Sequence, residues 1–351
     1  MMDFYLTNDW DNVLDSFPDE KKDIYFTHKY CSLYETKENK ALCAICKEEE
    51  NIMLMPFIRG MINNSYDFET SYGYGGPLAN TDDIEWCQKS FIGIHEYLAN
   101  QNYICGFTRF HPLLCNEEWL KGELASKDSI SNTIRVLYDR QTIAIDTSVC
   151  EEDIWSKQIT SKNRNMIRKA EKNLLEYKAE YDYASYDEFI KLYTNTMKRL
   201  SADDFYFFDR SYFDRLKGNL KGKSFLGTVR IDGKLICAAI FMYSKLYGHY
   251  HLEGSDHDFS GLGANNLLLW KTACEMHKLG IKEFHLGGGT SSSPDDSLYK
   301  FKKAFSGNEK KFYIGKEIFN TKLYNEICDK WKSENPDKDV IYGNRLLKYR
   351  Y

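Results

Sequence analysis

The chain has 351 residues, of which 42% are hydrophobic and 15% aromatic, and it carries a formal net charge of −5. This length exceeds what one hydrophobic core usually supports, and the apolar content is too high for a disordered chain, so we expect two globular domains. The acidic balance argues against a protein coated in nucleic-acid-binding surface, because phosphate contacts need clustered Lys and Arg, although a local basic groove stays open.

The sequence also bears on the compartment. No apolar stretch approaches the roughly 20 residues that span a bilayer, and the N-terminal segment MMDFYLTNDWDN is acidic, unlike a secretory signal. The ten cysteines are scattered. Cys43 and Cys46 are a close pair, but no second pair or histidine cluster lies near them in the sequence. We interpret the cysteines as reduced, mostly buried thiols and expect a cytoplasmic protein.

The first half of the sequence predicts a helix over 10–17, strands at 41–46 and 52–58, a helix over 83–100 and a strand at 103–110. The second half is clearer. After a strand at 142–147, the segment 151–173 contains no Pro or Gly and predicts one long helix. A strand at 177–183 and helices over 186–200 and 209–221 follow.

Three strands come next, SFLGTVRI at 224–231, KLICAAIFMY at 234–243 and KLYGHYHLEG at 245–254, the first two joined by an Asp232-Gly233 hairpin turn. A helix within 261–280, a strand at 281–286 and a glycine loop at 287–289 complete the pattern. This order, with its strand-to-glycine-to-helix step, resembles the GNAT acetyltransferase fold. We therefore expect an α+β chain of two tandem GNAT-like domains, each a mixed, mainly antiparallel sheet flanked by helices. The predicted domains are residues 1–148 and 149–351, and whether the last ~35 residues pack back on the first domain stays open.

Four segments resemble a particular family, the Fem enzymes that build peptidoglycan interpeptide bridges. They are SYGYGGPL at 71–78, SKNRNMIRKAEKN at 161–173, TMKRL at 196–200 and HLGGGTSSSPDDSLYKFKKAFSG at 285–307. The resemblance implies transfer of an amino acid from aminoacyl-tRNA to an amine on a precursor that carries a nucleotide or lipid pyrophosphate. The sequence offers no GxSxG motif and no cysteine in a motif context, which agrees with a reaction that needs no covalent enzyme intermediate.

The resemblance assigns catalytic roles first to Phe301 and Lys302, where the ring holds substrate and the lysine neutralises developing charge. The structural alternative is a solvated basic helix face with Phe301 as a core anchor. Arg199 matches an arginine that binds the acceptor's pyrophosphate, and the alternative is a basic residue at a helix C-terminus. Glu253 or Asp256, near the end of a central strand, is expected to accept the proton of the incoming amine.

Donor binding is predicted for a basic stripe and for the glycine step. Arg164, Arg168 and Lys172 lie four residues apart on one helix face, suited to tRNA phosphates, whereas the alternative is a solvated face. Gly261 and Gly263 precede a helix N-terminus that can hold a pyrophosphate, and the alternative is close packing. The residues expected to line the acceptor cleft are Tyr72, Tyr74, Arg109 and His111.

No metal is expected, because His249, His251 and His285 lack a recognisable ligand spacing. The first functional hypothesis is an aminoacyl-tRNA-dependent transferase that forms an amide on a nucleotide- or lipid-linked amino sugar or muropeptide. One alternative is an acyl-CoA-dependent N-acyltransferase of surface polysaccharide biosynthesis, and another is a non-catalytic precursor-binding protein. In either transferase reading the donor, aminoacyl-tRNA or acyl-CoA, is a substrate and no cofactor is permanently bound. DNA is not an expected partner, tRNA is one under the first hypothesis, and any membrane contact is peripheral, at the inner face.

Overall fold

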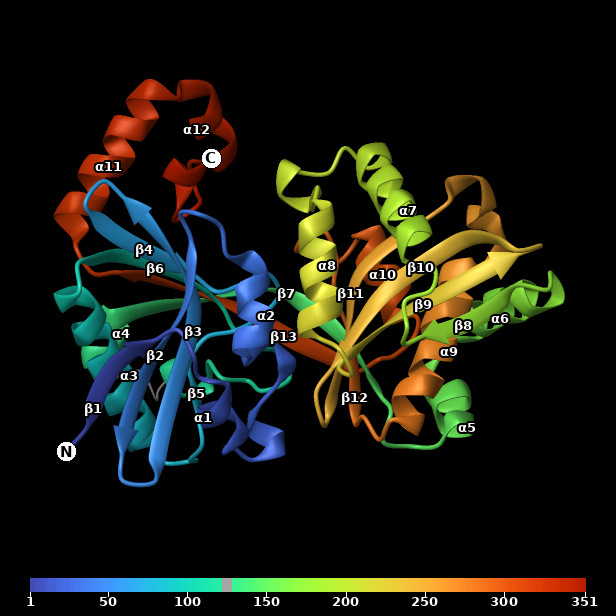
Figure 1. Cartoon of the computed structure of the whole chain (residues 1–351), viewed down its shortest axis with the longest axis horizontal. Coiled ribbons are helices and arrows are strands. Elements are labelled where there is room, and N and C mark those ends of the chain that lie inside the picture. Colours follow the sequence, from blue (N-terminus) through green and yellow to red (C-terminus); the bar gives the residue numbers. More distant parts are fainter. Residues whose placement is uncertain (122–127) are drawn as a thin grey trace. The chain divides into compact units, whose positions relative to one another are not determined.

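The computed structural model describes residues 1–121 and 128–351 (Figure 1). The chain forms two compact units, one made of Met1–Asp139 with Phe312–Tyr351 and the other of Arg140–Lys311. The sequence-based division fell after residue 148, whereas the units divide after Asp139, within the long strand β7 (Ile134–Asp146). Among the described residues, no helix combines the length and apolar character needed to cross a bilayer.

The first unit is built on a sheet with strand order β1-β2-β3-β4-β6-β13, with β5 added on β3. The pairings are antiparallel except that β4 and β6 run parallel. Its core is rich in rings, among them Phe57, Phe68 and Phe91. The strands are β1 (Asp3–Thr7), β2 (Lys40–Glu48), β3 (Asn51–Ile62), β4 (Ser65–Glu69), β5 (Leu78–Ala79), β6 (Tyr103–Arg109) and β13 (Glu309–Ile318). The helices are α1 (Asp11–Asp15), α2 (His28–Cys31), α3 (Ile84–Asn100), α4 (Asp128–Thr133), α11 (Thr321–Glu334) and α12 (Pro336–Tyr342).

The second unit carries the strand order β7-β12-β11-β10-β9-β8, in which the β11–β12 pair is parallel and the other pairs are antiparallel. Besides β7, its strands are β8 (Glu176–Glu180), β9 (Ser224–Ile231), β10 (Lys234–Tyr243), β11 (Tyr247–Ser255) and β12 (Glu283–Gly288). Its helices are α5 (Glu151–Asp153), α6 (Ser161–Lys172), α7 (Tyr186–Arg199), α8 (Arg210–Asn219), α9 (Ala264–Lys278) and α10 (Ser297–Lys303).

Helices cover both faces of this second sheet. Helix α9 packs on β8, β9 and β10, whereas α7 packs on β10 and β11. The two helices lie on opposite faces, because a side chain at Gly227 would meet Leu268 of α9 and one at Gly254 would meet the backbone of Tyr193 in α7. The largest core cluster of this unit lies on the α9 face.

The predicted long helix over 151–173 is wrong in one respect, because it is interrupted. Helix α5 runs into a π-helical turn over Ile154–Gln158, the backbone becomes extended at Ile159 and Thr160, and α6 starts at Ser161. The Thr160 hydroxyl accepts from the backbone N–H of Asn163, which is an N-cap in the middle of the predicted helix. The ten cysteines are free thiols, and all but Cys115 and Cys150 are buried.

Candidate active site

A β-bulge on β11 sets up the site in the second unit. In the β10–β11 pairing, Phe241 lies opposite Tyr250 and Ile240 lies opposite Leu252, so His251 is an extra residue on β11. Side chains alternate along a strand, and one extra residue reverses that alternation. Tyr250 and Glu253 are three residues apart and would otherwise face opposite ways. The bulge places both on the α9 face of the sheet.

The sheet pairing also changes next to these residues. Strands β11 and β12 pair only through Tyr247–His249 and Glu283–His285, while both strands continue beyond these residues. Tyr250 therefore follows directly after the point where pairing between the two strands stops, and Glu253 comes three residues later. At the same end of β12, the carbonyl of Gly288 accepts a hydrogen bond from Lys302 of α10.

Lys302 is buried, with 7% of its surface exposed. Its Nζ donates to the Gly288 carbonyl at 2.8 Å and lies 5.6 Å from the centroid of the Tyr250 ring. Burial lowers the pKa of Lys302 to about 8, and the charges of Asp296 and Glu253 act in the opposite direction. An amine with such a pKa exchanges protons readily near neutral pH, which an exposed lysine does not.

Of the two carboxylates predicted to accept a proton, Glu253 has the raised pKa that suits a general base. Burial raises its pKa, against the lowering effects of Ser255, Cys237, Arg199 and Asn265. Its Oε1 accepts from Asn265 Nδ2 at 3.3 Å, and the Cys237 thiol lies 3.8 Å away. A carboxylate with a raised pKa takes a proton more readily than an exposed one.

Asp256, the other predicted proton acceptor, has a different environment. Its Oδ2 forms an ion pair with Lys234 at 2.9 Å, and its Oδ1 accepts from the backbone of Asp258. These contacts, the hydrogen bond from Lys234 above all, lower the pKa of Asp256. Between the two candidates, the electrostatics favour Glu253 as the base.

Two further predicted residues flank this cluster. Phe301 is partly buried and packs against the core of the second unit, with its ring 5.4 Å from that of Phe305. Arg199, the last residue of α7, is exposed. Its charge lowers the pKa of Glu253, so the guanidinium lies within electrostatic reach of that carboxylate. The charge of Glu253 thus interacts with those of Lys302 and Arg199, and Phe301 precedes Lys302 in α10.

The basic stripe of α6 is engaged in contacts within its own unit. Arg164 donates to the carbonyls of Ile159 at 2.5 Å and Trp155 at 3.2 Å, at the end of the π-helical turn. The Arg168 guanidinium lies 5.4 Å from the Trp155 ring centroid. Lys172 is exposed. The geometry gives Arg164 a structural function and leaves Lys172 as the residue of the three best placed to meet a ligand.

The two glycines before helix α9, Gly261 and Gly263, differ in how much space surrounds them. Gly263 has φ +81°, and a Cβ there would lie 2.6 Å from the backbone oxygen of Met166 in α6, so both backbone conformation and packing require glycine. A Cβ at Gly261 would meet nothing within 4 Å. Helix α9 begins directly after Gly263 without a side-chain cap. Its first N–H groups are therefore not occupied by a capping side chain.

In the first unit, Tyr72 and Tyr74 belong to a packed group of rings. The Tyr30 hydroxyl donates to the Tyr72 carbonyl at 2.5 Å, and the Tyr25 and Tyr74 rings meet edge to face at 5.3 Å. Gly73, at φ +96°, lies against the Tyr25 ring, which a Cβ would approach to 2.4 Å. Both predicted tyrosines remain partly exposed.

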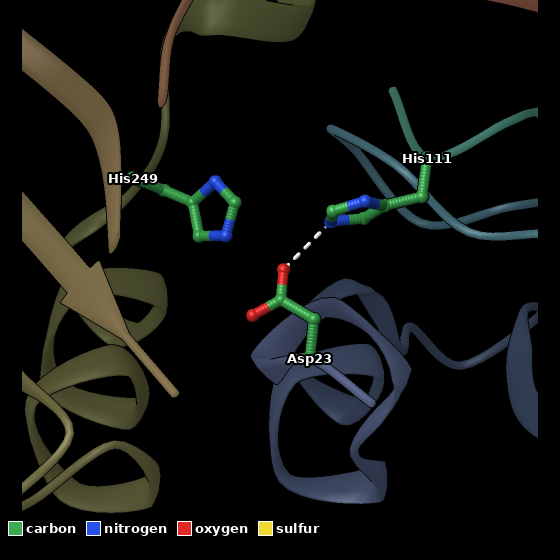
Figure 2. Close-up of side chains that lie close together, drawn as sticks. All are labelled: Asp23, His111 and His249. Carbon is green, nitrogen blue, oxygen red and sulfur yellow. Dashed lines mark hydrogen bonds and ion pairs between the residues drawn. The ribbon is translucent and has the colours of Figure 1, made fainter. Parts of the chain in front are cut away.

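Arg109 and His111 are held by specific partners in the same unit. Arg109 forms an ion pair with Glu69 at 3.0 Å and donates to the Thr70 carbonyl. His111 is fully buried, and Figure 2 shows its ring nitrogen Nε2 directed at Asp23, 2.7 Å away. Its Nδ1 accepts from the backbone N–H of Leu114, so Nε2 carries the proton given to Asp23. These contacts support a structural function for both residues.

His251 of β11 and His285 of β12 each have a hydroxyl neighbour. His251 Nε2 lies 3.1 Å from the Tyr212 hydroxyl, and His285 Nε2 lies 2.8 Å from the Thr142 hydroxyl. Burial lowers the pKa of His251 to about 3, so this ring is neutral at physiological pH. The His249 and His285 rings are 5.9 Å apart, edge to face.

Sequence reasoning missed Tyr250, Cys237 and Asn265, which surround Glu253 and Lys302. Simple alternation would have placed Tyr250 on the opposite face from Glu253. Nothing in KLYGHYHLEG marks the bulge, so the grouping depends on the register with β10. Asn265 could have been suspected, because an amide two residues after the Gly263 step lies at a helix start.

Comparison with known proteins bears on the fold and on the kind of domain. Residues 161–303 match the model of an acetyltransferase (GNAT) domain, and this range contains Glu253 and Lys302. No curated protein sequence matches the chain.

Solved structures extend the similarity to nearly the whole chain. The crystal structure of FemX is similar with a TM-score of 0.69 at 14% identity, covering 93% of this chain and 99% of FemX. A conserved protein of unknown function from Bacteroides thetaiotaomicron has a TM-score of 0.57 at 12% identity, covering 90% of this chain and 100% of its own. The C-terminal domain of a putative lysylphosphatidylglycerol synthetase from Agrobacterium fabrum has a TM-score of 0.56 at 13% identity, covering 90% and 92%. The predicted α+β fold of two GNAT-like domains is confirmed.

Proposed function

We propose that this chain, a GNAT-type acyltransferase with the Fem-type architecture, forms an amide on an amino group of a cell-envelope precursor, with aminoacyl-tRNA as donor. The observation that carries the proposal is a buried lysine whose Nζ lies 5.6 Å from the Tyr250 ring, on the face of the sheet that also presents Glu253. Burial lowers the pKa of this lysine to about 8 and raises the pKa of the carboxylate. The GNAT domain disfavours the alternative of a non-catalytic binding protein.

The proposed reaction follows from the charges of these two groups. The neutral amine of the acceptor attacks the carbonyl carbon of the donor, and the Glu253 carboxylate takes the proton released as the C–N bond forms. The Lys302 ammonium neutralises the oxyanion that develops on the carbonyl oxygen. As the bond to the leaving oxygen or sulfur breaks, that atom takes up the proton held by Glu253, so neither residue is consumed.

The acceptor class is proposed from two supports. The similar structures include FemX and the C-terminal domain of a putative lysylphosphatidylglycerol synthetase. The second name refers to a lysyl group on a membrane lipid. The exposed guanidinium of Arg199, within electrostatic reach of Glu253, is suited to hold a pyrophosphate of a nucleotide- or lipid-linked precursor. Such an acceptor would place the protein in the cytoplasm, at the inner face of the membrane when the precursor is a lipid.

Acyl-CoA is the second candidate donor, and one observation favours it. Helix α9 starts after Gly263 with no side-chain cap, and a helix N-terminus of this kind attracts the pyrophosphate of a CoA. The intrachain contacts of Arg164 and Arg168 point the same way, because they reduce what the α6 stripe offers to tRNA phosphates.

A ligand panel separates these donors and tests the acceptor class. The melting temperature of the purified chain is measured with acetyl-CoA, free CoA, UDP-sugars and a UDP-linked muropeptide, and each hit is repeated with Arg199→Ala and Lys302→Ala. Stabilisation by the UDP-linked muropeptide that Arg199→Ala abolishes, without a CoA response, supports the first proposal. Stabilisation by CoA moves the donor to acyl-CoA, and no response to any compound contradicts both.

A further inference from the structure

A chain of three side chains leads from the core of the second unit to the proposed base. Cys237 lies on β10, two residues from Ala239, which is paired with Glu253 across the strands. Asn265 is the second residue of α9. The Cys237 thiol donates to Asn265 Oδ1 at 3.0 Å, and Asn265 Nδ2 donates to Glu253 Oε1 at 3.3 Å.

These contacts fix which way the Asn265 amide faces. Cys237 is fully buried, and burial raises the pKa of its thiol well above the usual range, so it keeps its proton. A thiol S–H opposite the amide oxygen leaves the NH₂ group toward the carboxylate. The reversed amide would set two donors against each other at Cys237 and two acceptors against each other at Glu253.

We propose that Asn265 and Cys237 are positioning residues, which hold the Glu253 carboxylate at Oε1 in the orientation in which it accepts the amine proton. The inference rests on the proposed function, since it takes Glu253 as the base. The amide stabilises the ionised carboxylate through its hydrogen bond. The thiol fixes the orientation of the amide and also lies 3.8 Å from the same carboxylate oxygen, where it too lowers the pKa of Glu253. Burial alone would raise the pKa of Glu253 further than it does in the presence of this donor.

The test is a direct titration of Glu253 that needs no substrate. The protein is labelled with glutamate carrying ¹³C at the side-chain carboxyl, the Glu253 resonance is assigned with Glu253→Gln, and its chemical shift is followed with pH. Asn265→Ala is expected to raise the pKa of Glu253 by about one unit, the equivalent of one hydrogen bond to a charged group. Cys237→Ala is expected to raise it as well, since it removes the thiol donor and the partner that orients the amide, and Cys237→Ser, which keeps a donor, to restore the wild-type titration.

Cys274→Ala is the matched control, because this thiol is buried in α9 but is not among the groups that shift the pKa of Glu253. It should leave the Glu253 titration unchanged. Asn265→Leu, which keeps the shape of the side chain and removes the donor, serves if Asn265→Ala does not fold. An unshifted titration in the folded Asn265 variants would overturn the inference, as would a shift in Cys237→Ser equal to that in Cys237→Ala.

Failure of the proposed function looks different. If the titration shifts as expected but no acyl group is transferred from any donor, the positioning of Glu253 stands and the reaction assigned to it is wrong. If transfer occurs and Glu253→Gln keeps it, the reaction stands and Glu253 is not its base.

Discussion

The Nζ atom of Lys302 lies 2.8 Å from the carbonyl oxygen of Gly288, which ties helix α10 to the end of strand β12. The ammonium is thereby held near the Tyr250 ring, beyond the point where β11 and β12 cease to pair. A buried cation is costly for folding, and this cost is easiest to understand if the charge acts in the reaction.

Replacement of Lys302 by Met should separate activity from stability. The variant loses the cation that meets the oxyanion, and the rate of transfer should fall roughly 10²–10³-fold. Because the pKa of Lys302 is lowered from 10.5 to about 8, the variant should also be more stable at pH 7, by up to about 3 kcal/mol.

The size of this stability difference depends on pH. Between pH 8 and 10.5 the unfolded chain binds more protons at Lys302 than the folded chain does, so the wild type gains stability there as the pH rises. Urea unfolding of both proteins at pH 7 and pH 10 should show the advantage of Lys302→Met shrinking at pH 10. An equal difference at both pH values would contradict the lowered pKa.

The pH dependence of the reaction should be bell-shaped. Glu253 must be ionised to accept a proton, and Lys302 must be protonated to neutralise the oxyanion. The rate should therefore fall above pH about 8, and on the acid side at a pH above the ordinary range of a glutamate. Lys302→Arg keeps the charge, so its residual activity should persist above pH 9. If the activity of Lys302→Arg falls above pH about 8 as the wild-type activity does, a group other than Lys302 causes that fall.

Gly263 and Gly261 should differ sharply when each is replaced by Ala. Gly263→Ala puts a Cβ against the Met166 carbonyl at positive φ, and should cost at least about 1–3 kcal/mol of unfolding free energy. Gly261→Ala meets open space and should change stability by less than about 0.5 kcal/mol. Chemical denaturation measures both. If Gly261→Ala weakens CoA binding without lowering the unfolding free energy, the segment that contains Gly261 also binds the donor.

Arg164 and Lys172 provide a second matched pair on α6. Arg164→Ala removes donors from the carbonyls at the end of the π-helical turn and should lower stability by about 1–3 kcal/mol. Lys172→Ala, at an exposed position, should leave stability unchanged. Binding of tRNA, followed by filter retention, tests the stripe itself. Weaker retention with Lys172→Ala would support tRNA contact there, and equal destabilisation by both variants would contradict the structural assignment of Arg164.

The element order was predictable because long periodic segments and turn signals such as Asp232-Gly233 are local. The helix over 83–100 and the three strands of 224–254 lie close to where periodicity placed them. The helix break at Thr160 was harder to predict, because a threonine within a run of helix formers can lie either inside a helix or at its N-cap. Lys302 was predicted because the segment 285–307 resembles that of a known family. Its burial could not be predicted, because the neighbouring Lys300 and Lys303 suggest an exposed basic helix face.

The neighbours of Glu253 show where sequence reasoning ends. Their grouping depends on one extra residue, His251, in the pairing of β11 with β10, and a bulge is a property of two strands together. The preference for Glu253 over Asp256 likewise required the Lys234 ion pair, which is formed across the sheet.

The most direct test of the account is a transfer assay with both donor classes. Purified chain is incubated with UDP-linked muropeptide and either ¹⁴C-labelled aminoacyl-tRNAs or ¹⁴C-acetyl-CoA, and label that survives mild base is counted on the muropeptide, because an amide survives where an ester does not. We predict base-stable label with the wild type and its loss with Lys302→Met, in a variant at least as stable as the parent. Absence of transfer from every donor, or full transfer by Lys302→Met, would contradict the account.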